Sequence, residues 1–329
     1  MLHGACARVL PLRGRPGQTL MPTSSAIFLV GPSASGKSAV ALALAEKLGG
    51  EIVSVDSMQV YRGMDIGTAK PGAAERARVL HHLLDVVGVT EPFDAAKFVA
   101  LARRAEQEIR SRGRVPVFCG GTGLYLKAYL EGLGDAPSAD AALRAELECM
   151  PLEQLLLELQ QRDPVTYERI DKQNPRRVVR AVEVIRLSGK PFSHQRAAWI
   201  SAPHLKPYAP HLYGLRRADD DLWRRIESRV DGMFADGLVE ETRELLQHGL
   251  EQNRTAMQAI GYRQVVEHVR GERSLAATVE LVKSKTSQYT RRQMTWFRRQ
   301  MEVDWIMVDA SAPAQVIAGQ IIARHVADG

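Results

Sequence analysis

GPSASGKS, at residues 31–38, decides the fold class because it matches the phosphate-binding pattern G-x-x-x-x-G-K-[ST]. An apolar run at 26–30 precedes it, and residues 37–48 repeat apolar side chains at helical spacing. Strand, glycine-rich loop and helix in this order are the context that the pattern requires, so a chance glycine turn is the weaker alternative. We predict that phosphate oxygens are held by Gly31, Pro32, Ser33, Ala34, Ser35, Gly36, Lys37 and Ser38.

The chemistry of this P-loop follows from its backbone and two side chains. Its glycines let backbone N–H groups turn inward around phosphate oxygens, and the N-terminus of the following helix adds positive potential. Lys37 supplies a full charge, and the Ser38 hydroxyl is a ligand for Mg²⁺. The loop alone does not say what happens to the phosphates, because kinases, hydrolases and transferases all use it.

Strand and helix signals alternate after the loop. Residues 51–56 alternate apolar and polar side chains, 94–111 are typical of an amphipathic helix, and 115–119 predict a third strand before Gly120-Gly121. Alternation of strands with helices implies a parallel sheet. The predicted fold class is therefore α/β, with a P-loop NTPase-like parallel sheet flanked by helices.

The strand signals stop after Gly134. Residues 140–187 predict several short helices broken by Pro151, Pro164 and Pro175, and therefore an all-helical insertion domain. Strands at 211–215 and 303–308 and helices at 219–235 and 278–299 return the chain to the sheet. The predicted units are a disordered leader at 1–24, the first part of the core at 25–135, an insertion that contacts RNA at 136–200, and the return to the core with C-terminal basic helices at 201–329.

The positive charge is clustered. The formal net charge is +6, but residues 283–300 hold six basic residues and no acidic one, and the arginine-rich stretch 172–196 holds Glu183 as its one acid. Both runs are candidate contacts for a polyanion. No stretch approaches the roughly 18 uninterrupted apolar residues that span a bilayer, so no membrane association is predicted.

Cysteine usage fits a reducing compartment. Cys6, Cys119 and Cys149 form no CxxC pair and show no zinc-ligand spacing, so neither a disulfide framework nor a zinc site is predicted. We expect a cytoplasmic protein. Residues 1–24 carry arginines and no acid, as transit peptides do; the alternative is a disordered or misassigned start, with Met21 as the initiator.

Asp56 directly follows the predicted second strand. Open α/β sheets bind their ligands at the carboxyl ends of their strands, so this aspartate is expected beside the P-loop. A carboxylate there could hold Mg²⁺ through water, or act as a base on an acceptor. Its position alone does not choose between these roles.

The segment that begins at Asp56 resembles the second signature of the tRNA dimethylallyltransferases of the bacterial type. It reads DSMQVYRGMDIGTAKP and ends at Pro71. The resemblance covers nearly the whole chain after residue 25, and it continues through HHLLD at 81–85, GGTGLY at 120–125, NPRRVVR at 174–180, AIGYR at 259–263 and RRQMTWFR at 291–298.

The resemblance implies transfer of a dimethylallyl group from dimethylallyl diphosphate to N6 of the adenosine just 3′ of the anticodon in tRNA. Diphosphate would be the leaving group and Mg²⁺ the cofactor. The implied catalytic residues are Lys37 on the diphosphate, Asp56 as the base for the N6 proton, and Thr122 near the reacting centre. A base would help because the N6 lone pair is delocalised into the ring. For Thr122 the alternative is a hydroxyl that caps the helix beginning near Leu124.

The acceptor adenine would have to flip out of the anticodon loop to reach the P-loop, which gives the basic runs a purpose. Helical spacing places Arg176 and Arg180 on one face; the alternative is a solvated face that pairs with carboxylates. The predicted tRNA contacts are Asp56, Ser57, Met58, Gln59, Thr122, Arg144, Arg176, Arg177, Val178, Val179, Arg180, Gln258, Ala259, Ile260, Gly261, Tyr262, Arg263, Arg291, Arg292, Gln293, Met294, Thr295, Trp296, Phe297 and Arg298.

A basic and aromatic stripe is predicted on the last long helix. Lys285, Tyr289, Arg292, Trp296 and Arg299 advance by alternating steps of four and three residues, which places them on one face. Aromatics at this spacing are either platforms for RNA bases or core residues, and the sequence leaves both open for Tyr289 and Trp296.

Two further groups have less defined roles. His81-His82 are predicted to be structural, because no metal partner is visible near them in the sequence. Four arginines in or after the predicted strand at 211–215 could reach the donor phosphates, but the sequence does not rank them: Arg216, Arg217, Arg225 and Arg229.

Three rival functions share parts of this pattern. They are an adenylate isopentenyltransferase that uses free AMP, ADP or ATP, a P-loop small-molecule kinase, and a P-loop RNA-binding module without catalysis. The basic segments at 172–196 and 283–299 argue against a free-nucleotide acceptor, which has no need of them. We expect the tRNA anticodon stem-loop and dimethylallyl diphosphate as partners, and a monomeric enzyme.

Overall fold

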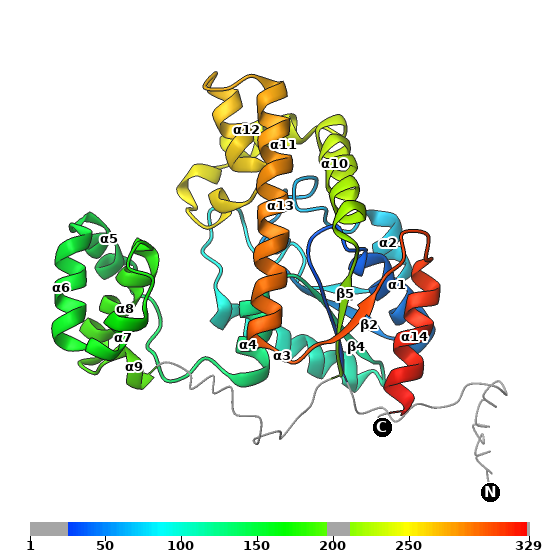
Figure 1. Ribbon diagram of the computed structural model, residues 1–329, viewed down its shortest axis with the longest axis horizontal. Helices are drawn as coiled ribbons and strands as arrows, with labels where there is room; N and C mark the ends of the chain where they lie inside the picture. Colours follow the sequence, from blue (N-terminus) through cyan, green and yellow to red (C-terminus); the bar gives the residue numbers. More distant parts are fainter. Residues whose placement is uncertain (1–25, 196–210, 328–329) are drawn as a thin grey trace, which may run out of the picture.

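The computed structural model describes residues 26–195 and 211–327. The predicted leader at 1–24 lies outside the described residues, as do 196–200 of the predicted insertion and 201–210 after it. Figure 1 shows a sheet surrounded by helices and a smaller group of helices to one side of it. None of the helices in the described ranges combines the length and apolarity needed to cross a membrane.

The strands form one parallel sheet in the order β3-β2-β4-β1-β5-β6. At its centre, Val30 of β1 pairs with Gly120 of β4, which also pairs with Val55 of β2. The carboxyl ends of these strands therefore lie side by side, and the loops after them share one edge. The predicted α/β class is confirmed, with strands β1 (Ile27–Val30), β2 (Glu51–Val55), β3 (His81–His82), β4 (Pro116–Gly120), β5 (His211–Arg216) and β6 (Asp304–Met307).

Helices cover both faces of the sheet, which explains why its strands are apolar on both sides. Alternate residues of β1 face opposite layers: Ile27 and Leu29 pack with α1 and α14, whereas Phe28 packs with α3 and α4. The helices outside the insertion are α1 (Lys37–Leu48), α2 (Ala73–Arg78), α3 (Ala95–Ser111), α4 (Gly123–Glu131), α10 (Asp219–Ala235), α11 (Leu238–Gln247), α12 (Tyr262–Val269), α13 (Leu275–Gln300) and α14 (Ala314–Ala327).

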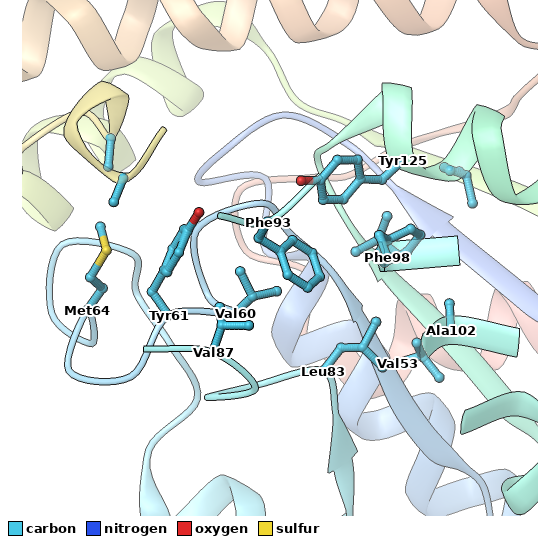
Figure 2. Packing of buried hydrophobic residues seen from close by; sticks show 14 of the residues in the cluster. Val53, Val60, Tyr61, Met64, Leu83, Val87, Phe93, Phe98, Ala102 and Tyr125 are labelled. Atoms are coloured by element: carbon cyan, nitrogen blue, oxygen red, sulfur yellow. The ribbon is translucent and has the colours of Figure 1, made fainter. Parts of the chain in front are cut away.

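The core on the α3 side extends beneath the loop that follows β2. Phe98 and Tyr125 stack with ring centroids 4.8 Å apart. Figure 2 shows Val60, Tyr61 and Met64 of the loop directed into the same cluster. Their burial anchors one side of a loop that carries several predicted site residues.

The helical insertion has a small core of its own. Its helices are α5 (Ala141–Cys149), α6 (Leu152–Arg162), α7 (Pro164–Arg169), α8 (Pro175–Ser188) and α9 (Phe192–Gln195). Leu147, Leu155, Leu159 and Val182 pack together between them. The prolines of this stretch stand at or just before helix starts, where the missing N–H needs no partner. Figure 1 shows these helices, coloured green, as a lobe beside α13.

The edge of the sheet differs from the predicted pattern. β2 ends at Val55, one residue before the end of the predicted run at 51–56, so Asp56 directly follows the strand as predicted. β3 consists of His81 and His82 alone, and two residues carry no periodic signal that could predict a strand. His82 Nε2 lies 2.7 Å from a carboxylate oxygen of buried Glu51, and His81 Nδ1 lies 2.8 Å from the Val79 carbonyl. Both rings thus have structural partners.

Candidate active site and nucleic-acid cleft

The P-loop is the sharp turn that joins β1 to α1. Its backbone enters the left-handed region at Ala34 (φ 64°) and Gly36 (φ 92°), a conformation that turns successive N–H groups toward one point. The Ser35 N–H donates to the Pro32 carbonyl at 3.3 Å and closes the turn. Lys37 Nζ donates to the same carbonyl at 3.3 Å, so the ammonium group lies over the loop. The arrangement is suited to an anion.

Several titratable groups meet at Lys37. Burial lowers the pKa of its ammonium group, and Arg229 also lowers it, whereas Cys119 of β4 and Asp56 after β2 raise it. Burial raises the pKa of the Cys119 thiol to about 11, so this thiol is neutral at physiological pH. The ends of β1, β2 and β4 therefore bring one lysine, one carboxylate and one neutral thiol together.

Two arginines that follow β5 brace the P-loop. Arg217 is buried, donates from Nε to the Ser35 carbonyl at 2.8 Å, and pairs with Asp221 at 2.7 Å. Arg225 donates from Nε to the Ala34 carbonyl at 3.0 Å. Because both guanidinium groups bond backbone oxygens, they fix the loop from its outer side.

Arg229 differs from Arg217 and Arg225 in its contacts. It is half-buried, and its side chain has no hydrogen bond or ion pair with the part of the chain that the structure describes. Burial and Arg225 both lower its pKa. A guanidinium group withdrawn from water without a counter-ion fits an anionic ligand. The structure therefore ranks Arg229 first of the four arginines for phosphate; Arg216 is exposed at the end of β5.

Asp56 and Thr122 lie on adjacent turns at the ends of β2 and β4. Asp56 Oδ1 accepts from the N–H groups of Met58 (2.8 Å) and Gln59 (3.3 Å), and no described residue bonds its Oδ2. Thr122 Oγ1 accepts from the Ser57 N–H at 3.1 Å. Thr122 precedes α4, but its side chain makes no cap bond there, so the alternative role as a helix cap is wrong. Its hydroxyl instead joins the two turns.

Gln293 of α13 bridges the P-loop and the turn after β4. Its side chain is buried; Oε1 accepts from the Ser33 N–H at 2.9 Å, and Nε2 donates to the Gly121 carbonyl at 3.0 Å. The long C-terminal helix is thereby tied to both turns that surround Lys37.

A pocket of about 220 Å³ lies beside this bridge. Trp296 packs so closely on Gly123 that a Cβ added to the glycine would lie 2.1 Å from the indole ring. Burial and Asp56 raise the pKa of Tyr289 to about 12, and Arg292 lies 5.8 Å from its ring centre. Both aromatics are partly buried and still face the pocket, which is lined by Gly121, Thr122, Gly123, Leu124, Tyr289, Arg292, Gln293, Trp296 and Phe297.

The pocket adjoins a larger cleft of about 1240 Å³ between the insertion and α13, since both share Leu124, Arg292 and Trp296 as lining residues. In Figure 1 the helices of the insertion lie to one side of α13. Asp171 is the single carboxylate among the described residues that line the cleft. Its strongly positive lining suits a polyanion, with Arg169, Arg176, Arg177 and Arg180 on one wall and Arg291, Arg292 and Arg299 on the other.

Comparison with known proteins agrees with this geometry. The family model described as IPP transferase matches residues 59–300. This chain belongs to the IPP transferase family. A tRNA dimethylallyltransferase of Geobacter metallireducens is 47% identical over 284 residues, which cover 85% of this chain and 91% of the relative. Another, of Pelotomaculum thermopropionicum, is 40% identical over 300 residues, covering 90% and 94%.

Solved structures share the fold of this chain. The crystal structure of a full-length tRNA isopentenylpyrophosphate transferase from Bacillus halodurans is 37% identical, covers 92% of this chain and 97% of its own, and superposes with a TM-score of 0.66. The structure of a eukaryotic dimethylallyltransferase acting on tRNA covers 92% of this chain and 80% of its own, with a TM-score of 0.74. It is 24% identical, so this likeness concerns the fold alone.

In this IPP transferase the predicted arginine cluster on α8 divides into two kinds. Arg180 pairs with Glu183 at 2.6 Å and donates to the Pro137 carbonyl at 2.6 Å, so for this residue the alternative of a carboxylate partner is confirmed. Arg176 and Arg177 line the cleft, and their side chains have no ion pair with any residue in 26–195 or 211–327. These two are the freer cations of the cluster.

Several predicted tRNA contacts have side chains that face the protein. Val178 and Val179 lie in the core of the insertion, and Tyr262 and Phe297 lie in the main core. The reason is that α8, α12 and α13 are amphipathic, and a contiguous sequence run includes both faces of a helix. Phe297 also lines the small pocket, and RNA contact by these four residues stays a prediction.

Other predicted contacts lie away from the cleft or have other partners. Arg144 pairs with buried Glu183 at 2.5 Å. Residues 258–263 lie around the start of α12 and do not line the cleft; nor do Met294 and Arg298, which lie on other faces of α13. Cleft residues outside the predicted set include Arg169 and Arg299, and Arg299 belongs to the predicted stripe. The basic run on α13 is the sequence signal that could have added Arg299 to the predicted tRNA contacts.

The possible Mg²⁺ ligands of the protein fit such an ion only if phosphate oxygens supply further ligands. No cluster of three or more His, Cys, Asp or Glu side chains suited to a metal occurs within the described ranges. Ser38 is exposed in the first turn of α1, next to Lys37. Asp56 follows β2, which β4 separates from β1, and its charge acts on Lys37. One hydroxyl and one carboxylate suit an ion that takes its remaining ligands from phosphate oxygens and water.

Proposed function

We propose that this chain transfers a dimethylallyl group from dimethylallyl diphosphate to N6 of the adenosine 3′-adjacent to the anticodon in tRNA, and releases diphosphate. Membership of the IPP transferase family supports the reaction class. The observation that carries the proposal is the position of Asp56 and Thr122. They lie between the P-loop and the pocket that adjoins the arginine cleft, so donor and acceptor would meet at one carboxylate.

The donor end of the site would grip the diphosphate by charge. The P-loop N–H groups, Lys37 and Arg229 converge on one region, and the half-buried setting strengthens each interaction with an anion. Ser38 would hold a Mg²⁺ ion that the diphosphate also binds, and this ion would neutralise part of the charge of the leaving group. These groups stabilise the diphosphate most when the bond to carbon breaks, because its negative charge is then greatest.

The transfer itself would be a substitution at the first carbon of the prenyl group. The carbon–oxygen bond to diphosphate breaks, a carbon–nitrogen bond to N6 forms, and the N6 proton passes to Asp56. The Oδ1 atom of Asp56 is occupied by two backbone N–H groups, whereas Oδ2 has no bond from the described residues. Oδ2 is thus the atom placed to accept the proton. The Thr122 hydroxyl accepts from the Ser57 N–H and would hold the turn after Asp56 in place on the side from which the adenine enters.

The acceptor would reach Asp56 from the cleft. Phosphates of the anticodon stem-loop would contact the arginines of both walls, with Arg176 and Arg177 on the insertion and Arg291, Arg292 and Arg299 on α13. The adenine would leave the loop and enter the small pocket, where Tyr289 and Trp296 offer aromatic faces. A cleft of about 1240 Å³ lined by arginines is more than a free nucleotide requires. We further propose a monomeric enzyme, because one chain supplies every group named. We also propose that it is cytoplasmic.

The test is a product assay with defined acceptors. Purified protein, Mg²⁺ and dimethylallyl diphosphate are incubated with several unmodified tRNAs that carry adenosine 3′ of the anticodon, and the digested RNA is examined by mass spectrometry. One prenylated adenosine per tRNA is expected, and none when that base is replaced by guanosine. Prenylation of AMP, ADP or ATP in place of tRNA would support the adenylate isopentenyltransferase instead, and no modified base in any tRNA would refute the enzyme assignment.

A further inference from the structure

The loop from Asp56 to Pro71 carries the proposed base on a backbone without regular structure. It contains turns and one isolated bridge, between Tyr61 and Val87, but no helix or paired strand. One side of it is buried through apolar residues such as Met64 (Figure 2). Positions of this kind need further partners if the carboxylate is to be held still, because irregular backbone has many accessible conformations.

The other side of the loop is held by Glu241 of α11. Its carboxylate accepts from three consecutive backbone N–H groups, those of Asp65 (3.2 Å), Ile66 (2.9 Å) and Gly67 (3.4 Å). Successive N–H groups that converge on one point form an anion-binding nest. Here the anion comes from a helix far along the chain, which ties the Asp56 loop to the C-terminal part of the core.

Tyr262 of α12 completes this contact. Its hydroxyl donates to Glu241 Oε1 at 2.6 Å and accepts from the Gly67 N–H at 3.1 Å. The side chain is fully buried, and a Cβ at position 67 would lie 2.5 Å from its ring. Gly67 is therefore required for the close approach, and the tyrosine fixes the orientation of the Glu241 carboxylate.

A chain of hydrogen bonds links this nest to Asp56. The Gln59 N–H donates to Asp56 Oδ1, and the Gln59 side chain donates to the Thr68 (3.2 Å) and Ala69 (3.3 Å) carbonyls. Thr68 follows Gly67 directly, so the residues that Glu241 bonds adjoin the two that the Gln59 side chain bonds. Movement at 65–67 would therefore displace the residue that orients the carboxylate.

A second clamp keeps the loop folded independently of Glu241. Lys70 Nζ is buried and bonds the Tyr61 carbonyl (2.8 Å), Asp65 (2.5 Å) and Asp85 (2.6 Å). These contacts stay within the first part of the chain, so removal of Glu241 should loosen the loop without unfolding it.

We infer that Glu241 is a positioning residue for the prenyl-transfer step: through its nest on residues 65–67, and with Tyr262, it fixes the Asp56 carboxylate relative to the donor. This inference rests on the proposed function of Asp56 as the base. It assigns Glu241 no contact with either substrate. The role is geometric, because a catalytic group displaced by about 1 Å loses on the order of 10²-fold in rate.

The informative variant is Glu241→Gln, which keeps the size of the side chain but sets an NH₂ group against backbone donors. We expect the single-turnover rate at saturating tRNA and donor to fall on the order of 10-fold to 10²-fold, with tRNA affinity unchanged. Glu240→Gln is the matched control, since Glu240 is exposed and its one ion pair within the described ranges is with Arg243, one helical turn away. Tyr262→Phe should give a smaller loss of rate in the same direction.

Two readouts distinguish positioning from a general structural role. In an Asp56→Ala background Glu241→Gln should have little further effect on rate, because both changes act on one group. Amide hydrogen exchange of free Glu241→Gln protein should show reduced protection at 56–68 but not in α1 or α3. An equal rate loss in both backgrounds, or unaltered protection at 56–68, would overturn the inference. If the wild-type protein modifies no tRNA, the proposed function is refuted instead. The hydrogen-exchange comparison would still show whether Glu241 holds residues 56–68 in place.

Discussion

The two ends of the proposed site are built differently. The diphosphate end is mostly contiguous: the P-loop at 31–38 runs from the end of β1 into the first turn of α1, and Arg229 of α10 adds one charge from elsewhere in the chain. The RNA end is composite, because its arginines come from the insertion and from α13, which lie far apart in the sequence and meet only in the fold. The first end depends on local backbone conformation, and the second depends on how the insertion is placed against the core.

This difference teaches that the two binding steps are separable. Gly36 and Ala34 shape the P-loop through their own backbone conformation, whereas Arg176 lines the cleft on the insertion. Apart from substitutions of Gln293, which ties α13 to the P-loop, changes at one end should therefore leave binding at the other end intact. The following experiments test that separation, and they begin with the largest expected effect.

Lys37→Met should nearly abolish the use of the donor. It removes the charge that meets the leaving diphosphate, so kcat/KM for dimethylallyl diphosphate is expected to fall by about 10³-fold. Steady-state kinetics with a labelled donor measure this, and filter binding should show unchanged tRNA affinity. Lys47→Met is the control, because Lys47 is exposed at the other end of the same helix. A parallel loss of tRNA affinity would show that the two ends are not separable.

Asp56→Ala acts where the two ends meet. Without a group to accept the N6 proton, turnover should fall by about 10²-fold or more, while tRNA affinity stays nearly the same. Asp56→Asn should behave similarly, because an amide keeps the shape but is no base. Single-turnover rates with excess enzyme provide the measurement. Turnover like that of the wild type in both variants would remove Asp56 as the base.

Charge removal in the cleft should affect RNA alone. Arg176→Ala combined with Arg177→Ala is expected to weaken tRNA binding by about 10-fold, and to reduce the salt slope by about 1 for each phosphate that is no longer neutralised. Binding titrations at several salt concentrations measure both quantities, and the KM for the donor should not change. Arg104→Ala, at an exposed residue of α3, is the control. An unchanged salt slope would place the phosphates elsewhere.

Trp296→Leu should give the smallest effect and decides what this aromatic does. If an RNA base stacks on the indole ring, tRNA affinity should fall about fivefold, as expected for about 1 kcal/mol of stacking. Trp223→Leu, at an exposed tryptophan of α10, should change nothing. A lower melting temperature with unaltered affinity would instead identify Trp296 as a packing residue against Gly123.

Sequence patterns predict the core well where the signal is local. The predicted helices at 37–48 and 219–235 coincide with α1 and α10. The P-loop marks the start of α1, and amphipathic spacing marks α10. β3 is invisible in the sequence, since His81 and His82 form a strand only through their pairing with β2. The pattern of strands and helices was enough to predict the parallel sheet.

The site is predictable only in part. The P-loop motif and the strand ends place Lys37, Asp56 and Thr122 together, as the structure shows. The special state of Arg229 depends on burial, which no motif encodes. Motif runs also include residues on the inner face of a helix, so Val178 was predicted to touch RNA although it packs inside the insertion. The nest on Glu241 has no sequence pattern at all.

Gln293 carries a consequence for how such an enzyme can diversify. The insertion has no described hydrogen bond to residues 31–38, so a different helical unit could replace it and change the choice of acceptor while the donor chemistry persists. Helix α13 has no such freedom, because Gln293 holds the Ser33 N–H while neighbouring turns face the cleft. Residues of the insertion can therefore change and alter acceptor preference without affecting the donor site. Residues of α13 are constrained by both substrates.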